Sequence, residues 1–189
     1  MLVGLIIVGV IVILLIWGVA IYNALVRLRA LVKEGFSGIT VQLRRRADLI
    51  PNLVSTVEGY ATHEREVLTQ VTAHRGDAVN AGSVAATAQA DAAFTGMLGR
   101  LMVVAEAYPD LKANQNFQQL QTELAEIEDH LQSARRYYNA TVRDLNTKIQ
   151  SFPNVLFARP LGFTEEEFYA DADASIQSAP KVTFGAAKA

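Results

Sequence analysis

The chain has 189 residues, of which 51% are hydrophobic, and its formal net charge at pH 7 is −2. This weak negative charge argues against a nucleic-acid-binding protein, which usually presents a strongly basic face. The absence of cysteine excludes disulfides, thiol nucleophiles and cysteine-based zinc sites. The hydrophobic residues are concentrated at one end, because residues 1–26 include 22 of them and no charged residue. We therefore expect a membrane segment followed by one folded domain.

The first predicted element is a transmembrane anchor over residues 1–26. Leu2 to Tyr22 is an unbroken run of apolar residues and glycine, which as a helix measures about 30 Å, the thickness of a bilayer core. Trp17 and Tyr22 are aromatic residues of the kind that favour the membrane interface. The alternative is a cleaved signal peptide with a small-residue site at 18–20, but the stretch is longer than an ordinary signal sequence and has no basic residue before it.

Basic residues follow the predicted span, at Arg27, Arg29 and Lys33 and again at 44–46. The positive-inside rule then predicts a single-pass protein of the inner (cytoplasmic) membrane, with the N-terminus outside and the rest of the chain in the cytoplasm. The first three cations either bind anionic headgroups or act only as topology signals. We expect residues 27–38 to connect the span to the domain as a continuous helix, with a hinge at Gly35 and Gly38 as the alternative.

Residues 39–172 are predicted to form an all-α antiparallel bundle of three long helices, because their apolar positions recur with a helical period. We expect the first helix at 39–75 with a kink at Pro51, and a loop at 76–83. The second is expected at 84–108, stopped by Pro109. The third, at 113–152, has an apolar residue at every seventh position: Phe117, Leu124, Leu131, Tyr138, Leu145 and Phe152.

The predicted bundle ends in a short helix. After Pro153 the chain is expected to lie back against the bundle, and the capping-box spacing of Thr164 to Glu167 predicts a helix that reaches about Ala172. Residues 173–189 are small and polar and are predicted to form a flexible tail, in which Val182 and Phe184 offer one docking contact.

The sequence carries no recognisable catalytic or metal motif. His63-Glu64 lacks the second histidine of a zinc-protease helix, and His130 lacks the paired motif of a di-iron bundle. No nucleophile elbow or phosphate-binding loop is present. We therefore expect no catalytic residue, no bound metal, no cofactor and no enzymatic activity, and we expect His63, His74 and His130 to be exposed or at the bundle edge.

Polar residues beside the apolar stripes predict a structural feature instead. They could form a partly buried network that fixes the helix register, since buried ion pairs favour one arrangement more than they stabilise it. The alternative is an ordinary solvated flank. The predicted structural polar network comprises Arg45, Arg46, Asp48, Asn52, Glu106, Glu128, Arg135 and Asn139.

Four segments carry a resemblance to a known family. They are residues 42–54 (QLRRRADLIPNLV), 105–114 (AEAYPDLKAN), 134–139 (ARRYYN), and Phe152-Pro153 followed by Gly162-Phe163. In this order and spacing they resemble the bacterial LemA family, over about residues 1–170. The resemblance implies an N-terminal membrane helix and a cytoplasmic antiparallel helical bundle. It implies no single activity: some relatives take part in forming magnetosome membranes, and others are encoded near a membrane zinc protease.

Two functional hypotheses follow, with the lipid bilayer as a partner in both. The first is a membrane-anchored scaffold that self-associates as a homo-oligomer and organises or remodels the membrane. Gly4, Gly9 and Gly18 would let neighbouring spans approach closely. The alternative is an adaptor or regulator of another membrane protein, such as a quality-control protease.

Overall fold

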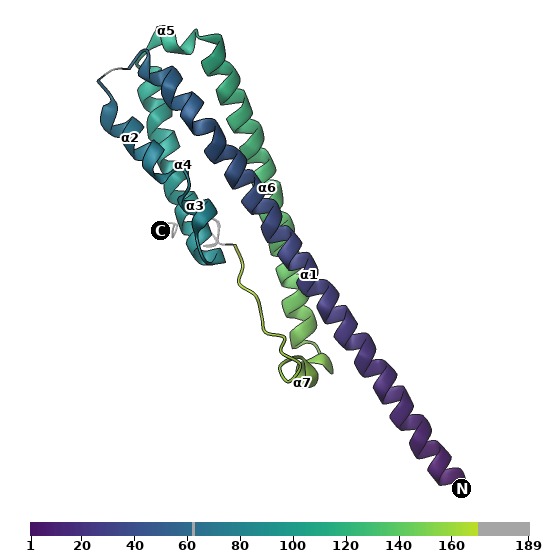
Figure 1. Ribbon diagram of the computed structural model, residues 1–189. Coiled ribbons are helices and arrows are strands. Elements are labelled where there is room, and N and C mark those ends of the chain that lie inside the picture. The colour runs from purple at the N-terminus through teal and green to yellow at the C-terminus, as the bar shows by residue number, and fades with distance from the viewer. Residues whose placement is uncertain (62, 170–189) are drawn as a thin grey trace, which may run out of the picture.

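The computed structural model describes residues 1–61 and 63–169 as helices joined by short connections (Figure 1). These described ranges contain no strand, which confirms the predicted all-α fold. The predicted tail at 173–189, with Val182 and Phe184, lies outside them. The helices are α1 (Leu2–Glu58), α2 (Arg65–His74), α3 (Asp77–Asn80), α4 (Val84–Glu106), α5 (Pro109–Lys112), α6 (Gln115–Gln150) and α7 (Asn154–Ala158).

The centre of the fold is the antiparallel contact between the two longest helices, α1 and α6 (Figure 1). The side chains of the seven-residue repeat are buried along α6 from Phe117 to Leu145. Phe152, the last predicted member of this repeat, lies beyond the end of α6 and is exposed. The N-terminus of α6 is capped by Asn114, whose side chain accepts a hydrogen bond from the Phe117 N–H at 3.1 Å.

Two hydrophobic clusters cover the two halves of the α1–α6 pair. In the half farther from the N-terminus, α2, α4 and α5 pack on α1 and α6. In the nearer half, α7 and the chain after it pack there, with contributions from α3 and the start of α4. Phe163 and Tyr169 belong to this second cluster, so part of the core comes from a segment that is not helical.

Helix α1 is a single helix of 57 residues, which confirms the predicted continuity between the span and the bundle. It continues through Gly35, Gly38 and Pro51. At Gly35 an added Cβ atom would lie 3.1 Å from the Tyr138 Cα atom, so the absence of a side chain lets the two helix backbones approach closely. Pro51 lies on an exposed part of α1.

The prediction of one helix over 39–75 is wrong in its second half. Helix α1 ends at Glu58, and α2 turns back to pack against α4 (Figure 1). The turn contains Gly59, a poor helix former, and α2 begins after Glu64. This reversal buries Leu68 and Val71, which a straight continuation would carry past the end of the bundle.

Three shorter predictions also need correction. The predicted loop at 76–83 contains α3, and Pro109 begins α5 instead of only ending a helix. The predicted helix at 164–172 is absent from its described part, residues 164–169, which form neither helix nor strand. Two backbone N–H groups of this segment are instead bonded to side chains of α6, as described below.

The N-terminal part of α1 projects from the bundle as an isolated apolar helix (Figure 1). Every residue from Leu2 to Ala20 is exposed, and burial against the bundle begins at Ile21. These exposed residues measure about 28 Å at the rise of an α-helix, close to the thickness of a bilayer core. The helix is therefore long and apolar enough to cross a membrane. The domain boundaries at residues 26 and 38 stay predictions, and Ile21 and Leu25 already contact the bundle core.

Candidate functional site

The site is built around a buried carboxylate on α4. Asp91 is the only charged residue between residues 84 and 99, and it lies one helical turn before Phe94, on the face that packs into the core. Its side chain is 1% exposed. A carboxylate this deeply buried requires charged or hydrogen-bonding partners, because desolvation strongly disfavours the free anion.

Three donors from three different segments meet Asp91. Arg46 of α1 pairs with its Oδ1 atom, and Arg135 of α6 pairs with its Oδ2 atom. The hydroxyl of Tyr169 also donates a hydrogen bond to Oδ2, at 2.7 Å. The carboxylate therefore joins α1, α4, α6 and the chain that follows α7.

Glu128 closes the arrangement into a ring of four charges. Its Oε2 accepts from Arg46 Nη1 at 3.2 Å, and its Oε1 accepts from Arg135 Nη1 at 3.3 Å. Arg46 also donates to the Thr95 hydroxyl at 3.1 Å. Two cations balance two anions, and we call this set (Arg46, Asp91, Glu128, Arg135 and Tyr169) the central charge network.

Two members of the central charge network, Arg135 and Tyr169, have raised pKa values. Burial of Arg135 acts to lower its pKa, but Asp91 and Glu128 outweigh this, so the pKa lies above its usual value and the guanidinium stays charged. Burial, reinforced by Asp91, raises the pKa of Tyr169, which therefore remains a hydrogen-bond donor. Such groups are suited to holding helices in register rather than to exchanging protons with a substrate.

A second polar arrangement holds the chain after α7, residues 163–169, which we call the C-terminal strap. Asn146 donates to the Glu166 carbonyl and accepts from the Glu166 N–H, both at 2.9 Å. Asn139 binds Tyr169 in the same way, at 3.1 and 2.9 Å. The spacings match, because seven residues of helix and three of extended chain both measure about 10 Å.

Each asparagine side chain thus bonds both the N–H and the carbonyl of one residue of the C-terminal strap, as the backbone of a neighbouring β-strand would. Between them, the Tyr138 hydroxyl donates to the Glu167 carbonyl at 2.8 Å. These bonds place Tyr169 against Asp91 and explain why residues 164–169 form no helix. Figure 1 shows the strap running from α7 back toward α3 and α4.

The structure brings together part of the polar network predicted from the sequence. Arg46, Glu128 and Arg135 meet in the central charge network, and Asn139 holds the C-terminal strap. The inclusion of four other residues is corrected, because their side chains are exposed and no ion pair or side-chain hydrogen bond joins them to the network in the described part of the chain. These residues are Arg45, Asp48, Asn52 and Glu106.

Helix geometry explains why predicted residues such as Arg45 and Glu106 lie outside the central charge network. Arg45 is rotated about 100° around α1 from Arg46, and Glu106 lies four turns along α4 from Asp91. Sequence reasoning missed Asp91, although a lone carboxylate on the apolar face of an alanine-rich helix was a usable signal. It also missed Tyr169, which carried no signal because its segment was expected to be helical.

Three of the five residues predicted for the membrane interface contact α7 or the chain after it. The Trp17 ring meets Phe157 of α7 at a centroid distance of 6.3 Å, and Tyr22 meets Phe163 at 5.7 Å. Arg29 lies 4.2 Å from the centre of the Phe163 ring and donates a hydrogen bond to the Gly162 carbonyl. The side chains of Arg27 and Lys33 are exposed. A role at the interface stays a prediction.

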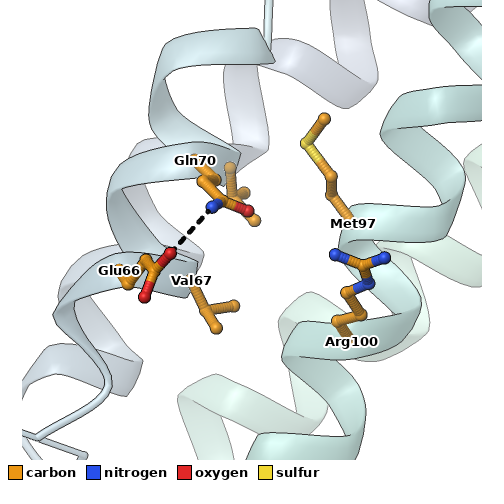
Figure 2. Close-up of a pocket in the computed structure, with 6 residues that line it drawn as sticks. Glu66, Val67, Gln70, Met97 and Arg100 are labelled. Carbon is orange, nitrogen blue, oxygen red and sulfur yellow. Dashed lines mark hydrogen bonds between the residues drawn. The ribbon is translucent and has the colours of Figure 1, made fainter.

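Two concave surfaces elsewhere lack a catalytic arrangement. Figure 2 shows the smaller, about 150 Å³, where Glu66 and Gln70 of α2 face Met97 and Arg100 of α4. Its only polar contact drawn is a 3.4 Å hydrogen bond from Gln70 to Glu66. The larger, about 510 Å³, is an open groove between α1 and α2.

Metal-binding geometry is also absent from the residues that the structure describes. They contain no cluster of three or more histidine, aspartate or glutamate side chains suited to a metal. His63, His74 and His130 are exposed, as expected, and His74 contacts Asp77 at 2.7 Å.

Alkaline pH is expected to loosen the contact between Tyr138 and the C-terminal strap. Burial, together with Glu166 and Glu167, raises the pKa of Tyr138 from 10.0 to about 12. The unfolded chain releases this proton first, so the stability contribution is complete below pH 10.0 and is lost as the pH rises to about 12. We expect Tyr138→Phe to show a smaller loss of unfolding free energy over this interval in urea titrations. Equal losses in the two proteins would contradict the prediction.

An apolar helix of membrane length that continues into a bundle with a charge-balanced core defines a membrane-associated helical protein. The model of the LemA family matches residues 35–184. The chain belongs to the LemA family, which confirms the resemblance drawn from its sequence segments.

Individual relatives agree with this family assignment. The chain is 26% identical over 179 residues to Magnetosome protein MamQ of Magnetospirillum gryphiswaldense, and equally to Magnetosome protein MamQ 2 of Paramagnetospirillum magneticum. These alignments cover 81% of this chain and 66% of each relative, just under two thirds. It is also 29% identical over 135 residues to Protein LemA of Metamycoplasma hominis, covering 69% of this chain and 60% of that protein.

Proposed function

We propose that this protein is a non-enzymatic, membrane-anchored scaffold that self-associates on the cytoplasmic face of the inner membrane and thereby organises or reshapes it. The cations Arg27, Arg29 and Lys33 directly after the exposed apolar segment support this orientation by the positive-inside rule. The relatives named as magnetosome proteins fit a role of this kind.

The observation that carries the proposal is the continuity of α1. One helix of 57 residues, about 85 Å long, is both the membrane-length segment and a central helix of the bundle. Because no loop separates the two parts, the bundle cannot rotate freely about the span. Lateral contacts between bundles would therefore set the angle between neighbouring spans, and many such contacts would impose curvature on the bilayer.

The span offers surfaces through which copies could associate. An added Cβ atom at Gly4, Gly9 or Gly18 would meet nothing within 4 Å, so all three positions are open to a neighbouring helix. Small residues at such positions allow close approach of helix backbones, which is a main source of helix association in membranes.

The proposal predicts an oligomer of the full chain in a membrane. We expect the protein in nanodiscs to have a mass that is a multiple of 20.6 kDa, and reconstituted vesicles to change shape as protein density rises. Gly9→Leu should reduce the oligomer fraction several-fold, whereas Val8→Leu, a conservative change at an exposed neighbouring position, should leave it unchanged.

Two outcomes would contradict this scaffold. One is a strict monomer at high protein density together with vesicles of unchanged shape. The other is crosslinking in cells that recovers a different membrane protein and no contact between copies, which would favour the adaptor hypothesis instead.

A further inference from the structure

A patch of large hydrophobic side chains lies exposed at the end of the bundle next to the span. It comprises Phe152, Val155, Leu156, Phe157 and Leu161, on and around α7. Phe152 is 81% exposed and Leu156 is 60% exposed. Contiguous exposed apolar side chains of this size mark an interaction surface, and we call this set the α7 patch.

The α7 patch is held rigidly by the buried side of the same helix. Asn154 and Ala158 of α7 are buried, and the Asn154 side chain donates to the Lys148 carbonyl at the end of α6, at 2.9 Å. The opposite side of α7 therefore points its apolar side chains away from the bundle. Burial in an apolar environment is the outcome that the hydrophobic effect favours for them.

The α7 patch lies beside the part of α1 where the exposed apolar segment ends. The Phe157 ring contacts Trp17, and the fully exposed part of α1 ends three residues later at Ala20. Tryptophan favours the boundary between headgroups and acyl chains. If residues from Leu2 to Ala20 occupy the bilayer core, Phe157 lies at that boundary.

Basic side chains beside the α7 patch favour an anionic lipid surface, whereas the acidic residues 165–167 lie on the C-terminal strap, which runs back toward α3 and α4 (Figure 1). Exposed Arg27 and Lys33 lie on α1, and exposed Arg159 directly follows α7. Glu34 is the one acidic side chain in residues 27–38. Basic residues near an anionic membrane surface are attracted to it.

We propose that the α7 patch docks into the headgroup region of the leaflet from which α1 emerges, giving the bundle a second contact with an anionic bilayer. An apolar surface flanked by cations is the combination that binds such an interface. This contact rests on the membrane anchor in the proposed function but does not require self-association. It would fix the tilt of the bundle relative to the bilayer.

Because the chain contains no cysteine, single cysteine variants of the full chain can be labelled at one site. Leu156→Cys carrying an environment-sensitive fluorophore is placed in nanodiscs of equal parts phosphatidylcholine and phosphatidylglycerol. Compared with a label at Val103→Cys, we expect its emission to be shifted to the blue and its quenching by iodide to be several-fold weaker. We also expect spin-labelled lipid to quench it. Val103 is equally suited to labelling, being 67% exposed on α4 in the far half of the bundle.

Val8→Cys, in the middle of the exposed apolar segment, separates the two proposals. Lipid quenching at residue 8 but iodide quenching at residue 156 would overturn membrane docking and leave the anchor intact. Absence of lipid quenching at residue 8 would overturn the anchor itself. A label at residue 156 that is quenched by neither agent would show that protein covers the α7 patch, which also overturns docking to lipid.

Discussion

Replacing Asp91 with asparagine is expected to lower the free energy of unfolding by about 3–5 kcal/mol, the usual result of removing one partner from a buried ion pair. The substitution keeps the shape of the side chain but removes its charge. Arg46, which is 3% exposed, and Arg135 would then share only Glu128 as a counter-charge. Urea unfolding of the full chain in detergent, followed by helical circular dichroism, measures the loss.

Matched variants separate the effect of burial from that of charge. Asp48→Asn makes the same chemical change on an exposed part of α1 and should shift stability by less than about 0.5 kcal/mol. Tyr169→Phe removes only a neutral donor to the Asp91 carboxylate and should cost about 1.5–3 kcal/mol, the usual range for a hydrogen bond to a charged group. Near-equal losses for Asp91→Asn and Asp48→Asn would show that the central charge network does not hold the helices together.

Removing both asparagines that hold the C-terminal strap is expected to lower the free energy of unfolding by about 2–6 kcal/mol. Each of Asn139→Ala and Asn146→Ala leaves a backbone N–H and a carbonyl of the strap without a partner, and such a loss typically costs about 1–3 kcal/mol. The two sites lie about 10 Å apart along α6, so their effects should add.

Hydrogen exchange at single amides shows whether the double variant loosens only the C-terminal strap or the whole fold. Hydrogen exchange should accelerate at the amides of Glu166 and Tyr169, because a segment with few contacts can open without global unfolding. Amides in the middle of α6 should keep their protection. Asn52→Ala, at an exposed asparagine of α1, is the control and should change neither measurement. Unchanged exchange at residues 166 and 169 in the double variant would rule out this role for the asparagines.

Local patterning predicted the parts of the fold in which one helix carries its own signal. The unbroken apolar run identified the membrane-length segment, and the seven-residue repeat identified α6 to within two residues at each end. Both signals depend only on the period of a single helix and the residues that cap or end it. The same reasoning marked Arg46, Glu128 and Arg135, since polar residues beside an apolar stripe stand out at helical spacing.

Tertiary structure alone decided how these helices meet. The pattern of residues 39–75 is equally compatible with one long helix and with the reversal after Glu58, and the choice depends on where the partner helices end. Asp91 joins Arg46 across 45 positions of sequence, and Tyr169 joins Asp91 across 78. Helical period reports which face of a segment is buried but not which segment covers it, because that depends on packing between elements far apart in the chain.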